Sequence, residues 1–572
     1  MKVALLHVTA KIKTIKITFV IIIFGICARL GYLQITNGDY FLTKSTKNFL
    51  RTEKMPSHRG NILDCNGILL ATNKPIVDVY WYGTGNNRLN EDQQRIYDQL
   101  CTILLLEQES ASIQAHERRH KKKLLARNIS FEQMCQIKEP LATSSNVLLQ
   151  TRAKRYYPYG SYASHIIGYL GNMQSEPLGI MGLEKLHQET LKGLDGTLLK
   201  TINSFGQNLA QREINKSLAG NDIHTTLNIT LQDIAERVFP SEYNGALIIM
   251  NPLDGAIRAL VSRPNFDPNV FLDPLSASEW EAMQHNHPFL NRALYAAYPF
   301  GSAFKLVTIS AALEHGLITP ESTWTCKGFF RFGHRNYWCN KRWGHGELTS
   351  AQAMAQSCNI PFFDIGSKID IDLLAEYAHK FGLGYKTGIS FPEKDGLIPS
   401  HAWKEEHLHE KWWQGETLSV AIGQSFLLAT PIQAARMISA IFTGYLVTPR
   451  IIESEPIMYE PFTIEPSTRR FLKKSMKSVI KHGTGSRINT ITDIKIYAKT
   501  STAQVSEFGK RKKDARHLEH AWLVAHVSYK QHEPFTFVIV MENVGSARKA
   551  VTVAKDFITR YKKAMDILFN YS

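Results

Sequence analysis

Serine and lysine stand at a spacing that suits acyl-transfer chemistry. Ser302 and Lys305 open the apolar stretch LVTISAALEHG, which is typical of a helix. Residues at positions i and i+3 share one helical face, so the amine is expected to reach the hydroxyl. A serine hydroxyl becomes a nucleophile when a base takes its proton, and a lysine can be that base where burial or a second cation lowers its pKa. The pair therefore predicts a serine nucleophile served by a lysine base.

The spacing alone is not selective, because Ser478 and Lys481 repeat it. This second pair ends a cationic stretch just before Gly483, where a helix is expected to stop. We expect it to be a solvated helix end. Only the neighbouring motifs distinguish the two pairs.

A second motif, Ser357-Cys358-Asn359, follows the helical run SAQAMAQ. Its serine hydroxyl would shuttle a proton, and its asparagine amide would orient Lys305 or the substrate. The motif therefore supplies two of the groups that a serine–lysine pair lacks.

A third motif, Lys499-Thr500-Ser501-Thr502, ends the strand-like run IKIYA. It would place a cation and hydroxyl groups beside a strand edge that could hold a peptide. Ser-x-x-Lys, Ser-x-Asn and Lys-Thr-x in this order form the serine acyl-transferase set of penicillin-binding proteins and β-lactamases. A rival copy, Lys386-Thr387-Gly388, matches the letters of the third motif better but stands in the glycine-rich loop GLGYKTG. A loop offers no strand edge, so we expect the third motif at 499–502.

Three cysteines and one histidine of the same region form a possible metal set. The spacing is C-x12-C-x5-H-x12-C, and the residues are Cys326, Cys339, His345 and Cys358. Three thiolates and one imidazole form the closed tetrahedral set of a structural zinc site. Two alternatives stay open on the residues alone: a Cys326–Cys339 disulfide, and a buried free thiol at Cys358.

The elements that must position these motifs predict an α+β domain. Residues 106–128, further upstream, predict a charge-rich helical excursion. The elements expected around the motifs are paired strands at 245–250 and 256–261, helices at 302–315, 349–366, 371–381 and 429–442, strands through IKIYAKT, 521–527 and 535–540, and a final helix from about 551 to 568.

The N-terminus predicts a membrane anchor. Its first sixteen residues hold four lysines and no acid, and residues 17–28 are then almost entirely apolar. Twelve residues are too few to cross about 30 Å of hydrocarbon, but the run resumes after Arg29, and a snorkelling arginine would let roughly twenty residues span. A cleaved signal peptide would need a small-x-small site soon after the apolar run, and a lipoprotein signal would need a small residue before Cys27. The sequence has neither, since Ile26 precedes Cys27. We therefore expect one uncleaved anchor, with the N-terminus in the cytoplasm and the rest outside.

The composition excludes several classes of protein. The chain has 572 residues, 44% apolar and 21% charged, which excludes a disordered, collagen-like or coiled-coil protein. Lys and Arg number 67 against 51 Asp and Glu, a net charge of +16 that alone would suit a nucleic acid, an anionic membrane or an anionic polymer. Because the anchor places the chain outside the cytoplasm, no nucleic-acid partner is expected.

Along almost its whole length the chain resembles the class B penicillin-binding proteins. The stretch WGHG at 343–346 favours the elongation-type branch, penicillin-binding protein 2, over the division branch. The stretches that carry the resemblance include RYYPYG at 155–160, HIIGYLG at 165–171, SRPNFDPN at 262–269, YPFGSAFK at 298–305, WGHGELT at 343–349 and AIGQSFLLATPIQ at 421–433.

The resemblance implies a multidomain protein of the bacterial inner membrane. Residues 1–38 would be a cytoplasmic tail and transmembrane anchor, and residues 39–225 an elongated α+β pedestal of the dimerisation type. Residues 226–572 would be a periplasmic α+β transpeptidase domain of β-lactamase-like fold. The implied activity is D,D-transpeptidation, which cross-links peptidoglycan stem peptides during cell elongation.

The resemblance also implies a role for each residue of the first two motifs. Ser302 would attack the D-Ala-D-Ala carbonyl and form an acyl-enzyme, with Lys305 as general base. Ser357 would relay a proton towards the leaving D-Ala nitrogen. Asn359 would hydrogen-bond Lys305 and the substrate amide.

The third motif would bind the substrate. Lys499 and Thr500 would hold its terminal carboxylate, and the backbone N–H groups of Ser302 and Thr502 would form an oxyanion hole. The family normally has glycine at the position of Ser501, because the backbone there must lie flat against the ligand. The serine keeps open a rival hypothesis, a catalytically weakened scaffold of the wall-synthesis complex.

Cofactors and partners follow from the same resemblance. Elongation-type members often carry zinc at positions corresponding to the Cys/His set, while acyl transfer itself needs no cofactor. The implied partners are peptidoglycan stem peptides, β-lactams, a membrane glycosyltransferase of the shape-elongation-division class and shape-determining proteins. A division-type transpeptidase stays open as an alternative. A β-lactam-hydrolysing or β-lactam-sensing protein is less suitable, because neither needs the long region 40–240.

Overall fold

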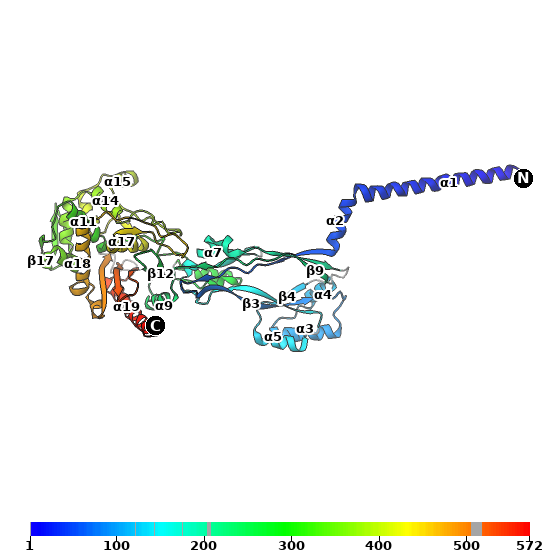
Figure 1. Ribbon diagram of the computed structural model, residues 1–572, viewed down its shortest axis with the longest axis horizontal. Coiled ribbons are helices and arrows are strands. Elements are labelled where there is room, and N and C mark those ends of the chain that lie inside the picture. The colour runs from blue at the N-terminus through cyan, green and yellow to red at the C-terminus, as the bar shows by residue number, and fades with distance from the viewer. Residues whose placement is uncertain are drawn as a thin grey trace. The chain divides into compact units, whose positions relative to one another are not determined.

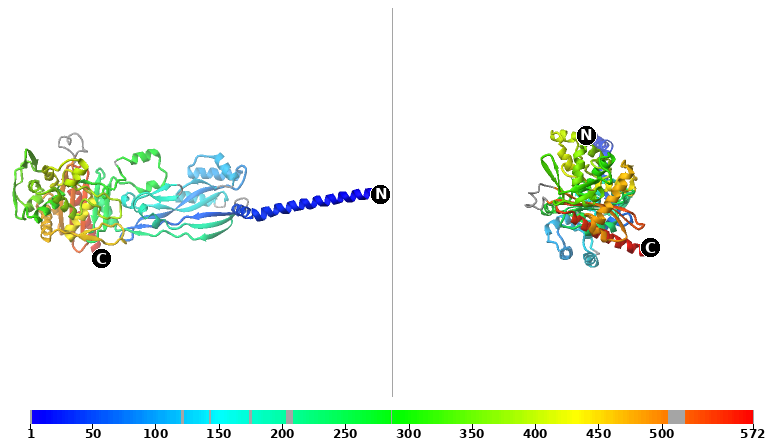
Figure 2. Two further views of the ribbon diagram at one scale, coloured as in Figure 1. Left: turned by 90° about the horizontal axis from the view of Figure 1, so that it is seen from above. Right: turned by 90° about the vertical axis from the view of Figure 1, so that its left-hand side faces the viewer.

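The computed structural model describes residues 2–119, 122–141, 144–173, 176–202, 208–285, 287–504 and 518–571. Its internal contacts divide the chain into two compact units, which are described separately. The first comprises Met1–Arg59, Asn73–Lys154 and Lys192–Asn221, and the second Gly60–Thr72, Arg155–Leu191 and Asp222–Ser572. Each unit combines helices with strands, as the α+β plan predicts (Figures 1 and 2).

The first unit contains an antiparallel three-stranded sheet of order β1-β8-β9. A buried cluster that includes Trp81 and Tyr97 forms a core in this unit, and the Trp81 indole donates to the buried Glu117 carboxylate at 2.9 Å. The elements that lie wholly or mostly in this unit are α1 (Lys2–Gly31), η1 (Tyr32–Thr36), α2 (Gly38–Phe49), β1 (Leu50–Met55), β3 (Leu69–Tyr82), α3 (Glu91–Leu104), α4 (Ser110–Arg118), β4 (Lys122–Ala126), α5 (Phe131–Leu141), β5 (Val147–Tyr156), β8 (Gly196–Ile202) and β9 (Asn208–Asn215).

The helical prediction for 106–128 is correct in its first part and wrong in its second. Helix α4 covers Ser110–Arg118, but Lys122–Ala126 is a strand that pairs antiparallel with β3, Tyr80 facing Leu124. Leu125 and Ala126 pack against the Trp81 cluster from this strand. Pairing with β3 therefore overrides the helical tendency of the charged stretch.

The N-terminal helix has the length and composition of a membrane span. The helical stretch Ala10–Thr36 is 27 residues long with a mean hydropathy of 1.9, and its side chains contact no other part of the chain closely enough to be buried. Within the described residues it is the one helix that meets both criteria. Arg29 lies within the stretch, with its guanidinium 5.3 Å from the Tyr32 ring.

The second unit is built on a five-stranded antiparallel sheet of order β12-β11-β23-β22-β21. The elements of its N-terminal half are β2 (Ile62–Leu63), α6 (Ser164–Ile167), β6 (Leu170–Met173), β7 (Glu176–Gly179), α7 (Gly182–Leu186), α8 (Gln188–Lys192), β10 (Ile223–His224), α9 (Ile229–Val238), β11 (Gly245–Met250), β12 (Ile257–Arg263), η2 (Pro268–Leu272), α10 (Ala277–Met283), β13 (Tyr298–Pro299), η3 (Gly301–Ala303) and α11 (Lys305–Glu314). The remaining elements are β14 (Thr323–Cys326), β15 (Phe329–Phe332), β16 (Arg335–Trp338), β17 (Gly346–Thr349), α12 (Ser350–Gln356), α13 (Ile360–Lys368), α14 (Ile371–Lys380), α15 (His401–Leu408), α16 (Gln414–Val420), β18 (Leu428–Ala429), α17 (Pro431–Thr443), β19 (Tyr445–Val447), β20 (Tyr459–Pro461), α18 (Pro466–His482), η4 (Ser486–Thr490), β21 (Ile494–Ala503), β22 (His520–Tyr529), β23 (Phe535–Met541) and α19 (Ala547–Tyr571).

Helices cover both faces of this sheet. Side chains alternate along a strand, so β22 sends Trp522 and Val524 into one core and Leu523 and Ala525 into the other. The core that holds Trp522 also contains residues of α11 and α17, whereas the core that holds Leu523 contains residues of α9 and α19 (Figure 1). Both faces are therefore apolar, which explains why β23 is buried along its whole length.

The helix predicted over 349–366 is interrupted at the second motif. Helix α12 ends at Gln356 because Ser357 takes a left-handed conformation with φ of 54°, and α13 begins at Ile360 with Pro361 in its first turn. A proline is favoured at that place, since its missing N–H costs no helical hydrogen bond there. The break points the peptide groups and side chains of 357–359 inward instead of along a continuous helix.

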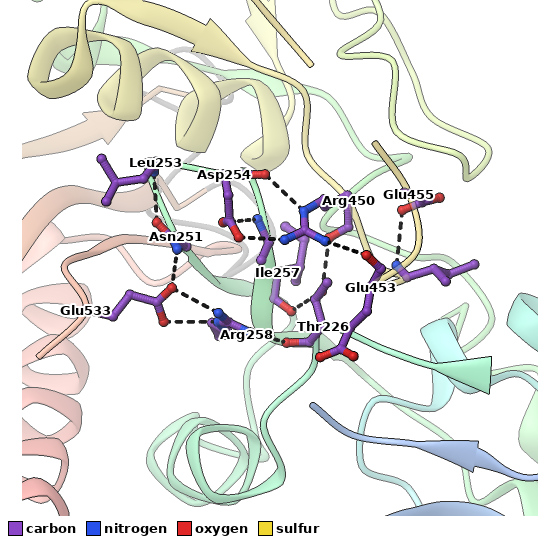
Figure 3. A network of polar contacts seen from close by, with 12 residues as sticks. Thr226, Asn251, Leu253, Asp254, Ile257, Arg258, Arg450, Glu453, Glu455 and Glu533 are labelled. Atoms are coloured by element: carbon purple, nitrogen blue, oxygen red, sulfur yellow. Dashed lines mark hydrogen bonds and ion pairs between the residues drawn. The ribbon is translucent and has the colours of Figure 1, made fainter. Parts of the chain in front are cut away.

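A polar network fixes the turns at one end of the sheet (Figure 3). Arg258 on β12 bonds the Glu533 carboxylate through two nitrogens, at 2.9 and 3.1 Å, and donates to the Thr226 carbonyl at 3.3 Å. Arg450 donates to the Asp254 carboxylate at 2.6 Å. The turn between β11 and β12 is thereby linked both to the turn before β23 and to the segment around residue 450.

Candidate active site

A tight turn before α11 presents Ser302. Gly301 has a φ of +55°, and a Cβ at this position would lie 2.4 Å from the Ser501 Oγ, so the turn requires glycine. The Gly301 N–H donates to the Gly423 carbonyl at 2.7 Å, which holds the turn from the other side. Ser302 is half-buried on η3, and Lys305 begins α11 one helical turn later.

Lys305 is fully buried and bonded to the second motif. Its Nζ donates to the Asn359 Oδ1 at 2.8 Å and to the carbonyls of Ser357 and Cys358 at 2.9 and 3.2 Å. The Phe362 ring lies 5.0 Å away and closes one side. Burial lowers the pKa of Lys305 to about 8, against a smaller opposite effect of the neighbouring thiols. The predicted meeting of the first and second motifs is therefore present in the structure.

Ser357 lies between two buried lysines. The Lys499 Nζ donates to its Oγ at 3.0 Å, and the Lys305 Nζ lies 3.4 Å from the same oxygen. Burial and then the charge of Lys305 hold the pKa of Lys499 well below its usual range. The hydroxyl of Ser357 thus connects the two amines, a position suited to proton relay.

The third motif lies on the edge strand of the sheet. β21 pairs with β22 on one side only, so within the described residues its other edge has no strand partner beside Lys499 and Thr500. Lys499, Thr500 and Ser501 are buried, whereas the Thr502 side chain is exposed. An edge strand of this kind can take an extended peptide as an additional strand.

Ser501 faces the turn that carries the nucleophile. Its Oγ donates to the Phe300 carbonyl at 2.8 Å, two residues before Ser302. The side chain is therefore directed at the Phe300–Gly301 backbone, and its hydroxyl fastens β21 to η3.

The competing sequence copies lie in other surroundings. The Thr387 hydroxyl and the Gly388 N–H both donate to the Glu393 carboxylate, which closes a loop without strand pairing. Ser478 lies inside α18, where its hydroxyl donates to the Lys474 carbonyl. The structure brings 302–305, 357–359 and 499–501 together and leaves the other copies out.

Two residues of the site were not found from the sequence. Thr484 shares a short hydroxyl–hydroxyl hydrogen bond with Thr500, and the Trp338 carbonyl accepts from the Asn359 Nδ2 at 3.2 Å. Thr484 lies two residues after the end of α18, between Gly483 and Gly485, and belongs to no recognisable sequence motif. The contact of Trp338 could not be predicted from its residue type, because it is made by the backbone carbonyl.

The four possible metal ligands converge beside the second motif. The ligand atoms of Cys326, Cys339, His345 and Cys358 all lie within 4.8 Å of one another. The His345 Nδ1 is 3.5 Å from the Cys326 and Cys339 sulfurs, and the Cys339 and Cys358 sulfurs are 3.7 Å apart. Cys326 and Cys339 are both free thiols, so the alternative disulfide is not formed.

The three separations of 3.5, 3.5 and 3.7 Å are close to those around a tetrahedral metal ion. Zinc bonds of about 2.3 Å to sulfur and about 2.05 Å to nitrogen in a tetrahedron require separations of about 3.8 Å between sulfurs and about 3.6 Å between sulfur and nitrogen. A closed set of three sulfurs and one nitrogen suits a structural role, because no position is left for a reacting molecule.

The assembled groups can perform acyl transfer. Ser302 is half-buried after a tight turn, and the buried Lys305, whose pKa is lowered, lies one helical turn away. The Ser357 hydroxyl links Lys305 to Lys499 on β21. A hydroxyl nucleophile, a base and a proton relay are thus present beside an open strand edge.

Two family models match the chain. Residues 245–559 match the penicillin-binding protein transpeptidase domain, and residues 54–225 match the penicillin-binding protein dimerisation domain. The first match covers the whole five-stranded sheet and all three motifs.

Similar proteins cover almost the whole chain. The peptidoglycan D,D-transpeptidase MrdA of Acinetobacter baumannii is 29% identical over 94% of this chain and 85% of its own length. The structure of the Helicobacter pylori penicillin-binding protein PBP2 in complex with MreC is 26% identical, with a TM-score of 0.77 over 90% of this chain and 99% of that one. A structure described as a peptidoglycan synthase complex that coordinates polymerization and crosslinking contains a chain 28% identical, with a TM-score of 0.77 over 96% of this chain and 98% of that one.

Proposed function

The chain belongs to the class B penicillin-binding proteins and is a peptidoglycan D,D-transpeptidase of the elongation type, and we propose that Ser302, Lys305, Ser357 and Asn359 carry its reaction. The observation that supports this assignment is the buried Lys305 amine bonded to the Asn359 Oδ1 at 2.8 Å, one turn after Ser302. A buried lysine without a paired carboxylate favours its neutral form, which is the form that can accept a proton.

The first half-reaction forms an acyl-enzyme. Lys305 takes the Ser302 proton while Oγ attacks the carbonyl of the penultimate D-Ala, and a C–O bond replaces the C–N bond to the last D-Ala. Ser357 passes a proton to that departing nitrogen, since its hydroxyl lies within 3.0 and 3.4 Å of both lysine amines. An amine of a second stem peptide then displaces Ser302, restores its hydroxyl and completes the cross-link.

The third motif binds the donor peptide. Lys499 and Thr500 hold the terminal carboxylate, because an arriving anion would restore the charge that burial and Lys305 disfavour on Lys499. The N–H groups of Ser302 and Thr502 bind the oxyanion, and one such donor contributes about 3 kcal/mol to lowering the barrier. Ser501 takes no direct part, because its hydroxyl is bonded to the Phe300 carbonyl.

We also propose that Cys326, Cys339, His345 and Cys358 hold a structural zinc ion. The support is the donor set and its separations of 3.5 and 3.7 Å, which agree with tetrahedral coordination. The ion would supply no chemistry to the reaction. The residues that benefit are Ser357 and Asn359, which flank one ligand.

The anchor and partners complete the proposal. Residues 1–38 would hold the protein in the inner membrane with the N-terminus in the cytoplasm, because four lysines precede the apolar run at 17–28. Residues 39–225 would form the pedestal and 226–572 the periplasmic transpeptidase domain. A glycosyltransferase of the shape-elongation-division class and a shape-determining protein are the proposed partners, since the similar chains stand in a synthase complex and in a complex with MreC.

Covalent labelling tests the reaction. Full-length protein in detergent should react with fluorescent penicillin, and Ser302→Ala should abolish the label, because the acyl bond needs the Oγ. Ser478→Ala removes the serine of the other Ser-x-x-Lys copy and should label like the wild type. Absence of label in the wild type, under conditions where a known penicillin-binding protein reacts, would contradict the assignment.

A further inference from the structure

A cationic, aromatic hairpin borders the second motif. Strands β15 and β16 pair antiparallel, with Phe329 opposite Trp338 and Arg331 opposite Asn336. Between residues 322 and 346 the sequence holds five Lys or Arg residues and no Asp or Glu. The reaction described above uses none of these cations.

The two faces of the hairpin differ in character. Phe330, Phe332 and Tyr337 point to the inner face, where they pack against the core that contains the cysteines. Because side chains alternate along a strand, the outer face carries Phe329, Arg331, Asn336 and Trp338, all exposed.

Aromatic rings and guanidinium groups gather on this outer face. The rings of Phe329 and Trp338 lie 5.7 Å apart, and the Arg342 guanidinium lies 4.4 Å from the Trp338 ring. Trp338 is 45% exposed and Phe329 41%, although large apolar side chains are ordinarily buried. We call this set, Phe329, Arg331, Trp338 and Arg342, the platform.

The platform is joined directly to the catalytic groups. The Trp338 carbonyl accepts from the Asn359 Nδ2 at 3.2 Å, while the Asn359 Oδ1 accepts from the Lys305 Nζ at 2.8 Å. Cys339, the next residue after Trp338, accepts from the Asn359 N–H at 3.4 Å. The Asn359 side chain therefore joins the hairpin that carries the platform to Lys305, the proposed base for Ser302.

We propose that the platform binds the acidic stem of the acyl donor, with Arg331 and Arg342 on carboxylates upstream of its D-Ala-D-Ala end and the two rings against its apolar surface. Charge complementarity supports this occupant, because a stem peptide carries free carboxylates and the hairpin carries cations alone. The donor is favoured over the acceptor, because the donor must extend away from Ser302 while it is acylating the enzyme. This inference rests on the proposed function.

The test compares three acylating reagents on full-length protein in detergent. The first is a thioester donor with a carboxylate-bearing stem, the second is the same donor with those carboxylates amidated, and the third is benzylpenicillin, which has no stem. The double variant Arg331→Glu/Arg342→Glu should slow acylation by the first reagent about tenfold, close to 1.4 kcal/mol, and leave the other two within about twofold. Phe329→Ala should slow both stem donors and leave benzylpenicillin unchanged, because the Phe329 ring belongs to the platform alone.

A matched charge reversal provides the control. Arg548 and Arg560 are exposed on α19, which packs against the opposite face of the sheet, and Arg548→Glu/Arg560→Glu should leave all three rates unchanged. Equal rates of the first reagent in the wild type and in Arg331→Glu/Arg342→Glu would overturn the inference. A wild type that fails to react even with benzylpenicillin would instead overturn the proposed function, so the two failures are distinguishable.

Discussion

The protonation of two buried lysines determines what the site can do. Lys305 and Lys499 both contact the Ser357 hydroxyl, and burial disfavours the charge on each. The two amines also repel one another when both are charged, which is the second cause of the lowered pKa of Lys499. Lys305 can therefore be neutral and act as a base beside Ser302, while Lys499 becomes charged when an anionic substrate binds next to it.

The rate of acylation should follow the titration of Lys305. Its pKa is about 8, and the neutral form is the base, so the second-order rate of penicillin acylation should rise as pH rises to about 8 and level off above. Between pH 6 and pH 7 the rise should be about tenfold, since the neutral fraction grows in proportion. The measurement is stopped-flow labelling from pH 6 to 9.5, corrected for hydrolysis of the reagent.

Lys305→Arg gives the matched test of that profile. Arginine stays charged throughout the range and cannot act as base, so the rate should fall by at least about a hundredfold and lose its dependence on pH. Lys474→Arg, at an exposed position on α18, should keep the wild-type profile. A wild-type rate that stays flat from pH 6 to pH 8 is incompatible with Lys305 as the base.

Replacing Ser501 should change stability more than reactivity. Its hydroxyl is bonded to the Phe300 carbonyl at 2.8 Å, so Ser501→Ala should cost about 1 kcal/mol of stability, and Ser501→Gly roughly 0.5–1 kcal/mol more because glycine is unfavourable inside a strand. Acylation should stay within about threefold, because the side chain faces η3. Thermal unfolding and penicillin labelling measure the two quantities.

The outcome decides between the enzyme and the weakened scaffold. Ser528→Ala, on the neighbouring strand β22, is the control for removing a strand hydroxyl. If Ser501→Gly accelerated acylation more than tenfold, the serine would be a defect of the site, and the scaffold hypothesis would gain support.

At the scale of elements, long periodic segments are predictable and short irregular ones are not. The strands at 245–250 and 535–540 and the helix at 429–442 are confirmed as β11, β23 and α17, because each buries a continuous apolar surface. The third motif is likewise confirmed as part of a strand, at Lys499–Ser501 of β21.

The hairpin β15–β16 could not be foreseen in the same way. Its strands have four residues each, and their inner side chains depend on a core made by residues far along the chain, such as Leu418. The break at Ser357 is similar, because its left-handed conformation follows from tertiary contacts of the motif. Sequence order predicted the residues that we propose for catalysis, whereas the contacts of Trp338 and Thr484 became evident only from the fold.

Removing the proposed metal should disorganise the second motif. Cys358 stands between Ser357 and Asn359, so loss of its ligand bond should lower both the melting temperature and the acylation rate of the chelator-treated protein. Metal analysis should find close to one zinc per chain in protein purified without refolding, and zinc should restore the rate. Cys326→Ser should mimic chelation, whereas Cys135→Ser, a half-buried thiol outside the set, should not. Fewer than about 0.2 zinc per chain would exclude the site.

At the scale of the whole molecule, the charge of +16 separates into local roles. Four lysines precede the apolar run at 17–28, two buried lysines are proposed to act in the reaction, and five cations lie between residues 322 and 346 beside the second motif. None of these groups requires a nucleic acid. Under the proposed function, these cations would instead act at the membrane surface and at an anionic cell-wall substrate.

The first of those groups makes a prediction about topology. Alkaline phosphatase, fused after residue 572, should be active in cells, because the helix Ala10–Thr36 would leave everything after it outside the cytoplasm. Replacing Lys2, Lys11, Lys13 and Lys16 by Glu should lower that activity severalfold, since the orienting charge is removed, whereas replacing them by Arg should preserve it. A fluorescent-protein fusion at the same position should behave in the opposite way. If the Glu variant exported the reporter as well as the wild type, the lysines would not set the orientation.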